Sequence, residues 1–305
     1  MSATEYGVVV IGGGTGNNVA AAAADAGLDT ALVEKGKLGG TCLNRGCNPS
    51  KMLIQAANAA NSVREADRFH VDATLEDTDM AAVVDEMDDI LGGIAEGMAA
   101  RYREKEHLTL YRDEAAFVDE RTVEVAGERV RGERVVVAAG SRPVVPPIDG
   151  LDEVDYLTST DALYLRDQPD SLVVLGGGYI AVELGYYFES MGTDVTIIEM
   201  QDRLVSREDE NVAATFTDIA RERHDVYTGY RATGVERDGA GVRVHAEPRE
   251  GDAITVDGDE LLVAAGRRPN TDTLNLDAAG IETDDRGFIE TDEHPSLVSR
   301  EIAWQ

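Results

Sequence analysis

The feature that most constrains the fold is a glycine-rich turn that occurs twice, each time between an apolar run and a helical pattern. In the first copy, the run Gly7–Ile11 leads into Gly12, Gly14 and Gly16, and an Ala-rich helix is expected over residues 18–26. In the second, Ser171–Leu175 leads into Gly176 and Gly178, with a helix over 180–191. A strand, a tight glycine turn and a helix form a βαβ unit together with the strand that follows. The sequence therefore predicts an α/β protein with two Rossmann-like, doubly wound domains.

Each unit closes on a carboxylate at the spacing that a dinucleotide site requires. Glu34 lies 22 positions beyond Gly12, and Glu199 lies 23 positions beyond Gly176. Such a site holds a pyrophosphate at the helix N-terminus and a ribose on the carboxylate. Ala181 fills the third position of the second copy, whereas the first copy has Asn17 there, so we expect a slightly displaced first helix.

The acid of the second copy also bears on cofactor choice. The carboxylate of Glu199 would repel a 2′-phosphate, which favours NAD(H). Arg203, four residues further on, keeps NADP(H) open.

The rest of the chain supplies helices, a meander and a linker. Helices are expected over 50–68 and 80–106, and short runs at 108–110, 122–125 and 129–137 predict an antiparallel meander. Prolines at 143, 146 and 147 then indicate a linker. We predict a first domain over residues 1–147, a second over 148–268, and a return of the first over 269–305.

Composition excludes several classes of partner. The 305 residues carry 59 acidic and 28 basic side chains, a formal net charge of −31. That balance disfavours nucleic acid and anionic lipid, since both need a positive surface. No run approaches the length of a membrane span and the first residues lack a leader pattern, so a cytoplasmic location is expected. Four of the basic residues are Lys and the rest Arg, and this Lys-poor, acidic surface indicates adaptation to high salt.

The sequence contains two cysteines, Cys42 and Cys47, five positions apart. A pair so close together is more often catalytic or metal-binding than a structural staple, and no further Cys or His stands near enough to complete a zinc site. Pro49 predicts a helix starting just after Cys47, and a helix N-terminus and the charge of Lys51 favour a thiolate. Two thiols beside a dinucleotide site can relay two electrons.

The segment Gly39–Lys51 resembles the redox-active signature of the FAD-dependent pyridine nucleotide–disulfide oxidoreductases, which include dihydrolipoamide dehydrogenase, mycothione reductase and mercuric reductase. Three further segments match that family in order: Val135–Pro143, Gly176–Glu183 and Ala264–Asn270. The resemblance covers nearly the whole chain.

The resemblance implies a role for each matching residue. FAD would bind the first unit, with Cys47 nearest the flavin and Cys42 as the interchange thiol, while Lys51 would pair with Glu183. NAD(H) would bind the second unit. The residues expected to be catalytic are Cys42, Cys47, Lys51 and Glu183, and those expected to bind cofactor are Gly12, Gly14, Gly16, Glu34, Gly40, Thr41, Lys51, Ala115, Gly140, Gly176, Gly178, Tyr179, Ile180, Glu199, Val235 and Gly266.

The family continues past position 305 with a Gly-Asp flavin segment and a dimerisation domain carrying a His-Pro…Glu pair. We therefore expect a truncated oxidoreductase that binds FAD poorly and turns over slowly. His294 precedes Pro295 but has no Glu at the family's spacing, so we interpret it as a loop residue. The resemblance also implies a homodimer, and we expect the domain that mediates dimerisation to be missing from this sequence.

Substrate choice remains open between several disulfides. Glu199 and the Leu-Asn pair after Cys42 favour a dihydrolipoamide dehydrogenase, acting on a small dithiol or a lipoyl-bearing protein. The turn at Thr15–Asn17, together with Arg45 and Asn48, favours a reductase of a low-molecular-weight disulfide of the mycothione or bis-γ-glutamylcystine type. A mercuric reductase-like enzyme and an inactive dinucleotide-binding fragment are the remaining alternatives.

Overall fold

The computed structural model describes residues 2–291 and divides into two compact units, each built from separate stretches of chain. Among the described residues, the first unit comprises 2–48, 90–142 and 267–291, and the second comprises 49–89 and 143–266. The predicted cofactor-domain boundaries at 147 and 268 remain a prediction, because compactness alone does not say which ligand a unit holds.

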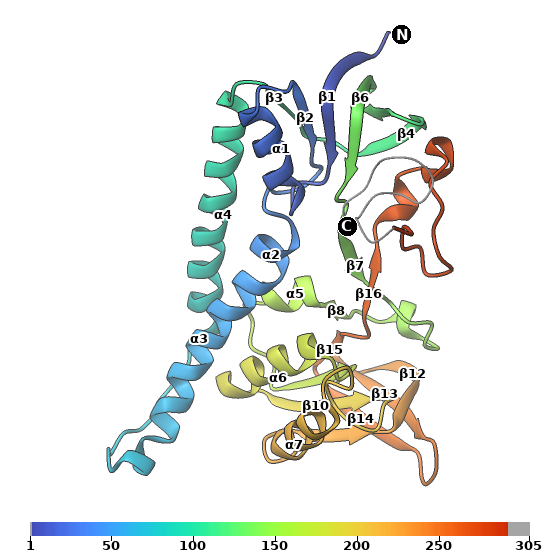
Figure 1. Ribbon diagram of the computed structural model, residues 1–305. Coiled ribbons are helices and arrows are strands. Elements are labelled where there is room, and N and C mark those ends of the chain that lie inside the picture. Colours follow the sequence, from blue (N-terminus) through green and yellow to red (C-terminus); the bar gives the residue numbers. More distant parts are fainter. Residues whose placement is uncertain (1, 292–305) are drawn as a thin grey trace. The chain divides into compact units, whose positions relative to one another are not determined.

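The first unit is a six-stranded sheet in the order β3-β2-β1-β6-β5-β4 (Figure 1). Its parallel part contains β1 and β2, together with β3 and β6, and β4 and β5 extend it as an antiparallel meander onto β6. The strands are β1 (Thr4–Ile11), β2 (Thr30–Val33), β3 (Leu108–Tyr111), β4 (Ala115–Asp119), β5 (Thr122–Val125) and β6 (Glu128–Val137).

Alternate residues of β1 face the two sides of this sheet. Val8 and Val10 pack on one side with Ala20 and Ala24 of helix α1 (Gly16–Asp25) and with Ala99 of α4 (Met80–Glu104). The opposite side packs against the meander and against four residues of the returning chain: Leu274, Leu276, Ile281 and Ile289. The 269–291 segment is thus part of the first unit's core.

The predicted meander is partly wrong. The run at 108–110 forms β3, which pairs parallel with β2, and the first meander strand is β4, which the sequence did not indicate. The reason is connectivity: β3 follows the long helix α4, and a helical crossover returns the chain parallel to the strand it left. The helix expected over 50–68 is α3 (Cys47–Arg64), followed by a short 3-10 turn, η1 (Ala66–Phe69).

The second unit contains a five-stranded parallel sheet, β11-β10-β9-β15-β8, and a three-stranded antiparallel sheet, β12-β13-β14 (Figure 1). The second βαβ unit is β9 (Ser171–Leu175), α6 (Tyr179–Met191) and β10 (Asp194–Glu199). The other elements are β8 (Leu157–Thr158), α5 (Ser159–Leu163), α7 (Glu210–Ala220), β11 (Asp225–Thr228), β12 (Tyr230–Asp238), β13 (Gly241–Pro248), β14 (Ile254–Gly258) and β15 (Glu260–Val263).

Two short strands, β7 (Ser141–Pro143) and β16 (Arg267–Pro269), pair where the chain passes between the units. The short helices are α2 (Gly40–Arg45), η2 (Leu151–Glu153), η3 (Thr271–Thr273) and η4 (Leu276–Ala279). Within the described part of the chain, no helix is both long and apolar enough to cross a membrane. His294 and Pro295 lie outside the described residues.

Candidate active site

The first glycine turn is shaped for close backbone approach. Gly12 has a φ of 110°, and a Cβ there would lie 2.1 Å from the carbonyl oxygen of Ala138. A Cβ on Gly16 would lie 2.8 Å from Cγ1 of Val10, so Gly16, rather than the third fingerprint position, sets the approach of α1 to β1. Asn17 is buried instead and donates through Nδ2 to the sulfur of Met98.

Glu34 braces this turn. One carboxylate oxygen accepts from the backbone N–H of Gly13 and the other from that of Gly36, each at 2.6 Å. The N-terminus of α1 has no side-chain cap, since the Thr15 side chain makes no capping bond. Uncapped amides next to a fixed carboxylate are what a dinucleotide needs for its pyrophosphate and ribose. The residues present therefore fit the ADP half of FAD.

The redox loop packs directly on this turn. The Gly39 N–H donates to the carbonyl of Gly13 at 2.8 Å, and a Cβ on Gly40 would lie 2.4 Å from Cα of Gly14. The buried side chain of Asn44 holds the loop from inside by donating to the carbonyls of Leu38 and Gly40. Thr41 and Cys42 follow Gly40 in α2, so the first thiol is held next to the first glycine turn.

Cys42 and Cys47 are both exposed, one within the short helix α2 and the other at the start of the next helix, α3. Cys47 is the first residue of α3, and Pro49 is the third, where its missing N–H costs no helical hydrogen bond. The Cys42 thiol donates to Oδ1 of Asn48 at 3.6 Å. Burial and the neighbouring Cys47 raise the pKa of Cys42, while the backbone amides of residues 47 and 48 act in the opposite direction. Cys42 is therefore held as a thiol by its surroundings, beside amides able to stabilise a thiolate.

Lys51 and Glu183 form an ion pair within the second unit. Nζ of Lys51 lies 2.5 Å from Oε1 of Glu183, and the Ser50 hydroxyl donates to Oε2 at 3.0 Å. Lys51 comes from α3, one turn after Cys47, and Glu183 comes from α6. The pairing that the resemblance implied is present, and Ser50 is a partner that the sequence did not indicate.

The second glycine turn repeats the design of the first. Gly176 has a φ of 114°, and a Cβ there would lie 2.5 Å from the carbonyl oxygen of Ala264. Glu199 is buried and accepts from the backbone N–H groups of Gly177 and Gln201. Around Gly178, at the uncapped start of α6, there is open space for a ligand, because a Cβ would meet no heavy atom within 4 Å. This turn fits the pyrophosphate of a nicotinamide dinucleotide.

The other expected cofactor residues lie in more varied surroundings. Tyr179 is exposed and Ile180 half-buried in the first turn of α6. Gly140 and Gly266 each lie three residues after the end of a strand, β6 and β15, with φ values of 69° and 132°. Ala115 and Val235 are buried in the two cores, so main-chain atoms are what each can offer, and the N–H of Val235 already donates to Asp149. The roles of all these residues remain predictions.

Among residues 2–291, no group of three or more His, Cys, Asp or Glu side chains is arranged to hold a metal ion. Arg203, which kept NADP(H) open, pairs with Glu210 at 3.0 Å.

Comparison with known proteins gives the class that these features define. The family model "Pyridine nucleotide-disulphide oxidoreductase" matches residues 6–299, so the chain belongs to this family. The family binds FAD and uses NAD(P)H as electron donor, and its glutathione-reductase-type α/β fold is the one seen here.

Three relatives illustrate the range within the family. The chain is 38% identical to dihydrolipoyl dehydrogenase 2 of Haloarcula marismortui, over 94% of this chain and 62% of that protein. It is 34% identical to a mercuric reductase of Staphylococcus aureus, over 95% of this chain and 53% of the relative. Among solved structures, the HOCl-induced flavoprotein disulfide reductase RclA of Escherichia coli superposes with a TM-score of 0.86 at 28% identity, covering 98% of this chain and 65% of that one. The chain thus spans between half and two thirds of the length of these relatives.

Proposed function

We propose that the protein to which this chain belongs passes electrons between NAD(H) and a disulfide–dithiol substrate, as a dihydrolipoyl dehydrogenase does. The observation that supports this most directly is the packing of the Cys42 loop on the first glycine turn through Gly39 and Gly40. Bound FAD would supply a ring that accepts hydride from NADH and exchanges electrons with the cysteine pair. The chain's own residues would place the Cys42–Cys47 pair beside that ring and would favour the protonated thiol of Cys42 once the disulfide is reduced.

The second glycine turn supports NADH as the reductant. Glu199 is buried with both oxygens held by backbone N–H groups, so its negative charge lies where a 2′-phosphate would have to enter. Arg203, the nearest candidate to neutralise it, is paired with Glu210. We expect NADH to bind more tightly than NADPH.

Substrate identity is the finest part of the proposal. The haloarchaeal dihydrolipoyl dehydrogenases among the relatives and the high-salt composition favour dihydrolipoamide or a lipoyl-bearing protein. Asn48 beside Cys42 supports the second candidate, a low-molecular-weight disulfide, because its amide adds a polar contact at the interchange thiol. A homodimer and a cytoplasmic location are part of the same proposal.

The test begins with the 305-residue chain in molar KCl. The chain is first titrated with FAD under conditions that leave Cys42 and Cys47 oxidised to a disulfide. One equivalent of anaerobic NADH should then pass two electrons through the flavin to that disulfide and give two thiols per chain that react with a thiol reagent, and a second equivalent should bleach the flavin absorbance. Cys42→Ser and Cys47→Ser should be bleached by the first equivalent of NADH and gain no new thiols. Rates with dihydrolipoamide, disulfides of small thiols and Hg²⁺ then rank the substrates. A chain that binds neither FAD nor NADH would contradict the proposal and support the inactive-fragment alternative.

A further inference from the structure

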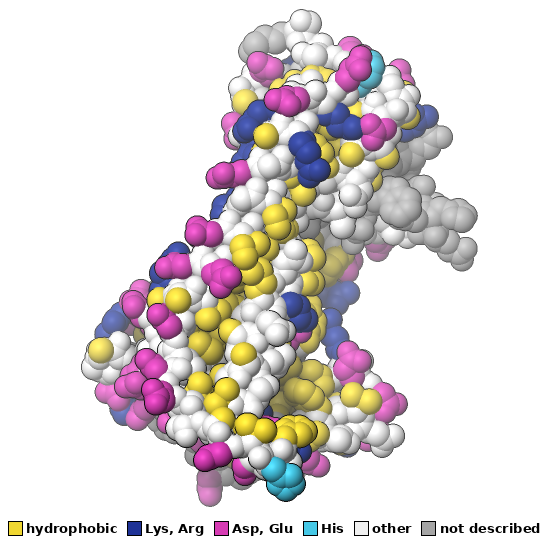
Figure 2. Space-filling view, turned by 90° about the vertical axis from the view of Figure 1, so that its left-hand side faces the viewer, with side chains coloured by type: hydrophobic (Ala, Val, Ile, Leu, Met, Phe, Trp, Pro, Cys, Tyr) yellow, Lys and Arg dark blue, Asp and Glu magenta, His cyan; other side chains and the backbone are white. Residues whose placement is uncertain are grey.

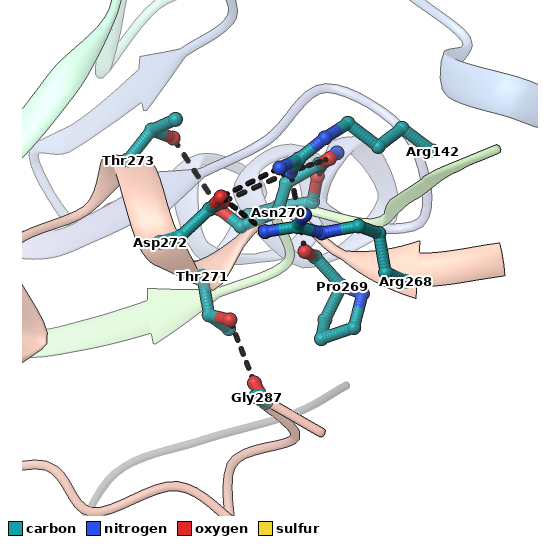
Figure 3. A network of polar contacts seen from close by, with 9 residues as sticks. Arg142, Arg268, Pro269, Asn270, Thr271, Asp272, Thr273 and Gly287 are labelled. Carbon is teal, nitrogen blue, oxygen red and sulfur yellow. Dashed lines mark hydrogen bonds and ion pairs between the residues drawn. The ribbon is translucent and has the colours of Figure 1, made fainter. Parts of the chain in front are cut away.

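Asn270 lies at the centre of a polar network next to the short strands β7 and β16 (Figure 3). Arg142 donates to both carboxylate oxygens of Asp272, at 2.9 and 2.5 Å, and to Oδ1 of Asn270 at 3.1 Å. Arg268 also donates to Oδ2 of Asp272, at 2.6 Å. The guanidinium of Arg142 thereby fixes which end of the Asn270 amide is oxygen and which is nitrogen.

The nitrogen end of that amide points to the main chain after β6. Nδ2 of Asn270 donates to the carbonyl of Ala139 at 2.8 Å, and the backbone N–H of Asn270 donates to that of Gly140 at 3.0 Å. One residue therefore satisfies two successive carbonyls of the turn 138–140. An amide side chain can donate here and accept from Arg142 at once, which a carboxylate cannot do.

The turn 138–140 packs against the first glycine turn, which contains Gly12, Gly14 and Gly16. The Ala138 N–H donates to the carbonyl of Ile11 at 2.7 Å, and Ala138 provides the oxygen that a Cβ on Gly12 would approach to 2.1 Å. A Cβ on Gly16 would lie 3.1 Å from Cβ of Ala138. A shift of the turn 138–140 would therefore displace the first glycine turn, from which α1 starts.

We propose that Asn270 is a positioning residue for the first dinucleotide site: it fixes the carbonyls of Ala139 and Gly140, and through Ala138 the glycine loop that receives the pyrophosphate of FAD. The proposal rests on the proposed function, in that this loop holds FAD. Arg142 and Asp272 orient the Asn270 amide through their hydrogen bonds.

The chain offers a matched control for the key hydrogen bond. Asn275 also donates through Nδ2 to a main-chain carbonyl, that of Phe117, at 2.8 Å, within the same unit. Phe117 lies in β4, away from the glycine loop in the sheet order. Asn275→Asp removes a donor of the same kind without touching the turn 138–140.

The experiment measures FAD dissociation constants and flavin fluorescence for the 305-residue chain in molar KCl. Asn270→Asp keeps the acceptor for Arg142 but sets a carboxylate oxygen against the Ala139 carbonyl. It should weaken FAD binding about tenfold and change the fluorescence of the bound flavin. Both variants should lower the unfolding midpoint of the FAD-free chain to a similar degree, because each loses one hydrogen bond of the same kind. Asn275→Asp should nevertheless keep the dissociation constant for FAD within about twofold of wild type.

Wild-type affinity in Asn270→Asp, or an equal loss in both variants, would overturn this proposal alone. Failure of the unsubstituted chain to bind FAD would overturn it together with the proposed function. Should Asn270→Asp not fold, Asp272→Asn leaves the amide in place and loosens Arg142. A dissociation constant raised two- to threefold would then support the proposal, and an unchanged one would overturn it.

Discussion

The pair formed by Lys51 and Glu183 joins residues 132 positions apart in the sequence. We expect Glu183→Gln to slow reduction of bound FAD by NADH about tenfold, because a neutral amide holds the ammonium of Lys51 less firmly and misplaced groups cost rate. Stopped-flow absorbance of the flavin measures this step.

The matched control is Glu189→Gln on the same helix. Glu189 pairs with Arg223 at 2.6 Å and is similarly half-buried, but it is not part of the redox site. Equal reduction rates in wild type and Glu183→Gln would show that the ion pair does not position Lys51 for the reaction.

Asp272 makes part of the free energy of unfolding depend on pH in the acid range. Hydrogen bonding from Arg142 lowers the pKa of Asp272 from 3.8 to about 2. Because the folded value is depressed, its contribution is full above about pH 4 and is lost as the pH falls towards 2. We expect wild type to be more stable than Asp272→Asn at pH 5 and this advantage to shrink by pH 3. Denaturant unfolding at both pH values measures it, and a gap that stays constant would contradict the assignment.

The site residues that were predicted from the residue pattern itself have neighbours fixed by a local motif, whereas the pairing of Lys51 with Glu183 was implied only by the family resemblance. Glu34 and Glu199 follow their glycine turns at a set spacing, and the two cysteines lie within one loop. Asn270 and Ser50 were not predicted as site residues, since each acts on a partner more than 100 positions away. Asn48 was noticed as a departure from the family, but its contact with Cys42 depends on how α2 and α3 meet.

At the scale of elements, helix α4 carries glycines with no evident packing role. A Cβ on Gly97 would meet no heavy atom within 4 Å, and the residue is exposed. Gly97→Ala should stabilise the chain by about 0.5–1 kcal/mol, because alanine loses less backbone entropy in a helix. Gly12→Ala is the contrasting change and should destabilise by about 2 kcal/mol or more, since its Cβ would overlap Ala138. Denaturant unfolding of both variants in molar KCl gives the comparison, and a destabilised Gly97→Ala would contradict it.

Helices and strands were predictable where the hydrophobic periodicity agreed with the glycine and proline residues that bound an element. Both βαβ units follow from apolar runs bounded by glycine, and the long helix α4 follows from its helical period. Strand β4 was missed because it begins with two alanines, which have a low preference for strands, and because it lies outside the βαβ unit. Strand β12 contains Gly234 and several charged residues, and its inner face becomes visible only once β13 pairs with it.

For the whole molecule, charge is the dominant property. Asp and Glu side chains are spread over the face shown in Figure 2, and the net charge is −31. Self-repulsion of this size is screened when the Debye length falls to about 3 Å, near 1 M salt. We expect the thermal midpoint to rise steadily from 0.1 to about 2 M KCl and FAD affinity to rise with it. A thermal midpoint that does not depend on salt over that range would contradict adaptation of the protein to high salt.

The interleaving of the two units has a consequence for biosynthesis. The second unit has all its strands once the ribosome has passed Gly266, whereas the first began with β1 and still lacks Leu274, Leu276, Ile281 and Ile289 on one side of its sheet. During translation the second unit can therefore complete its sheets first, as an insert in the sequence of the first unit. Asn270 emerges just after that moment, so the residue proposed to set the flavin loop is also among the first to draw the returning chain back onto the turn made more than a hundred residues earlier.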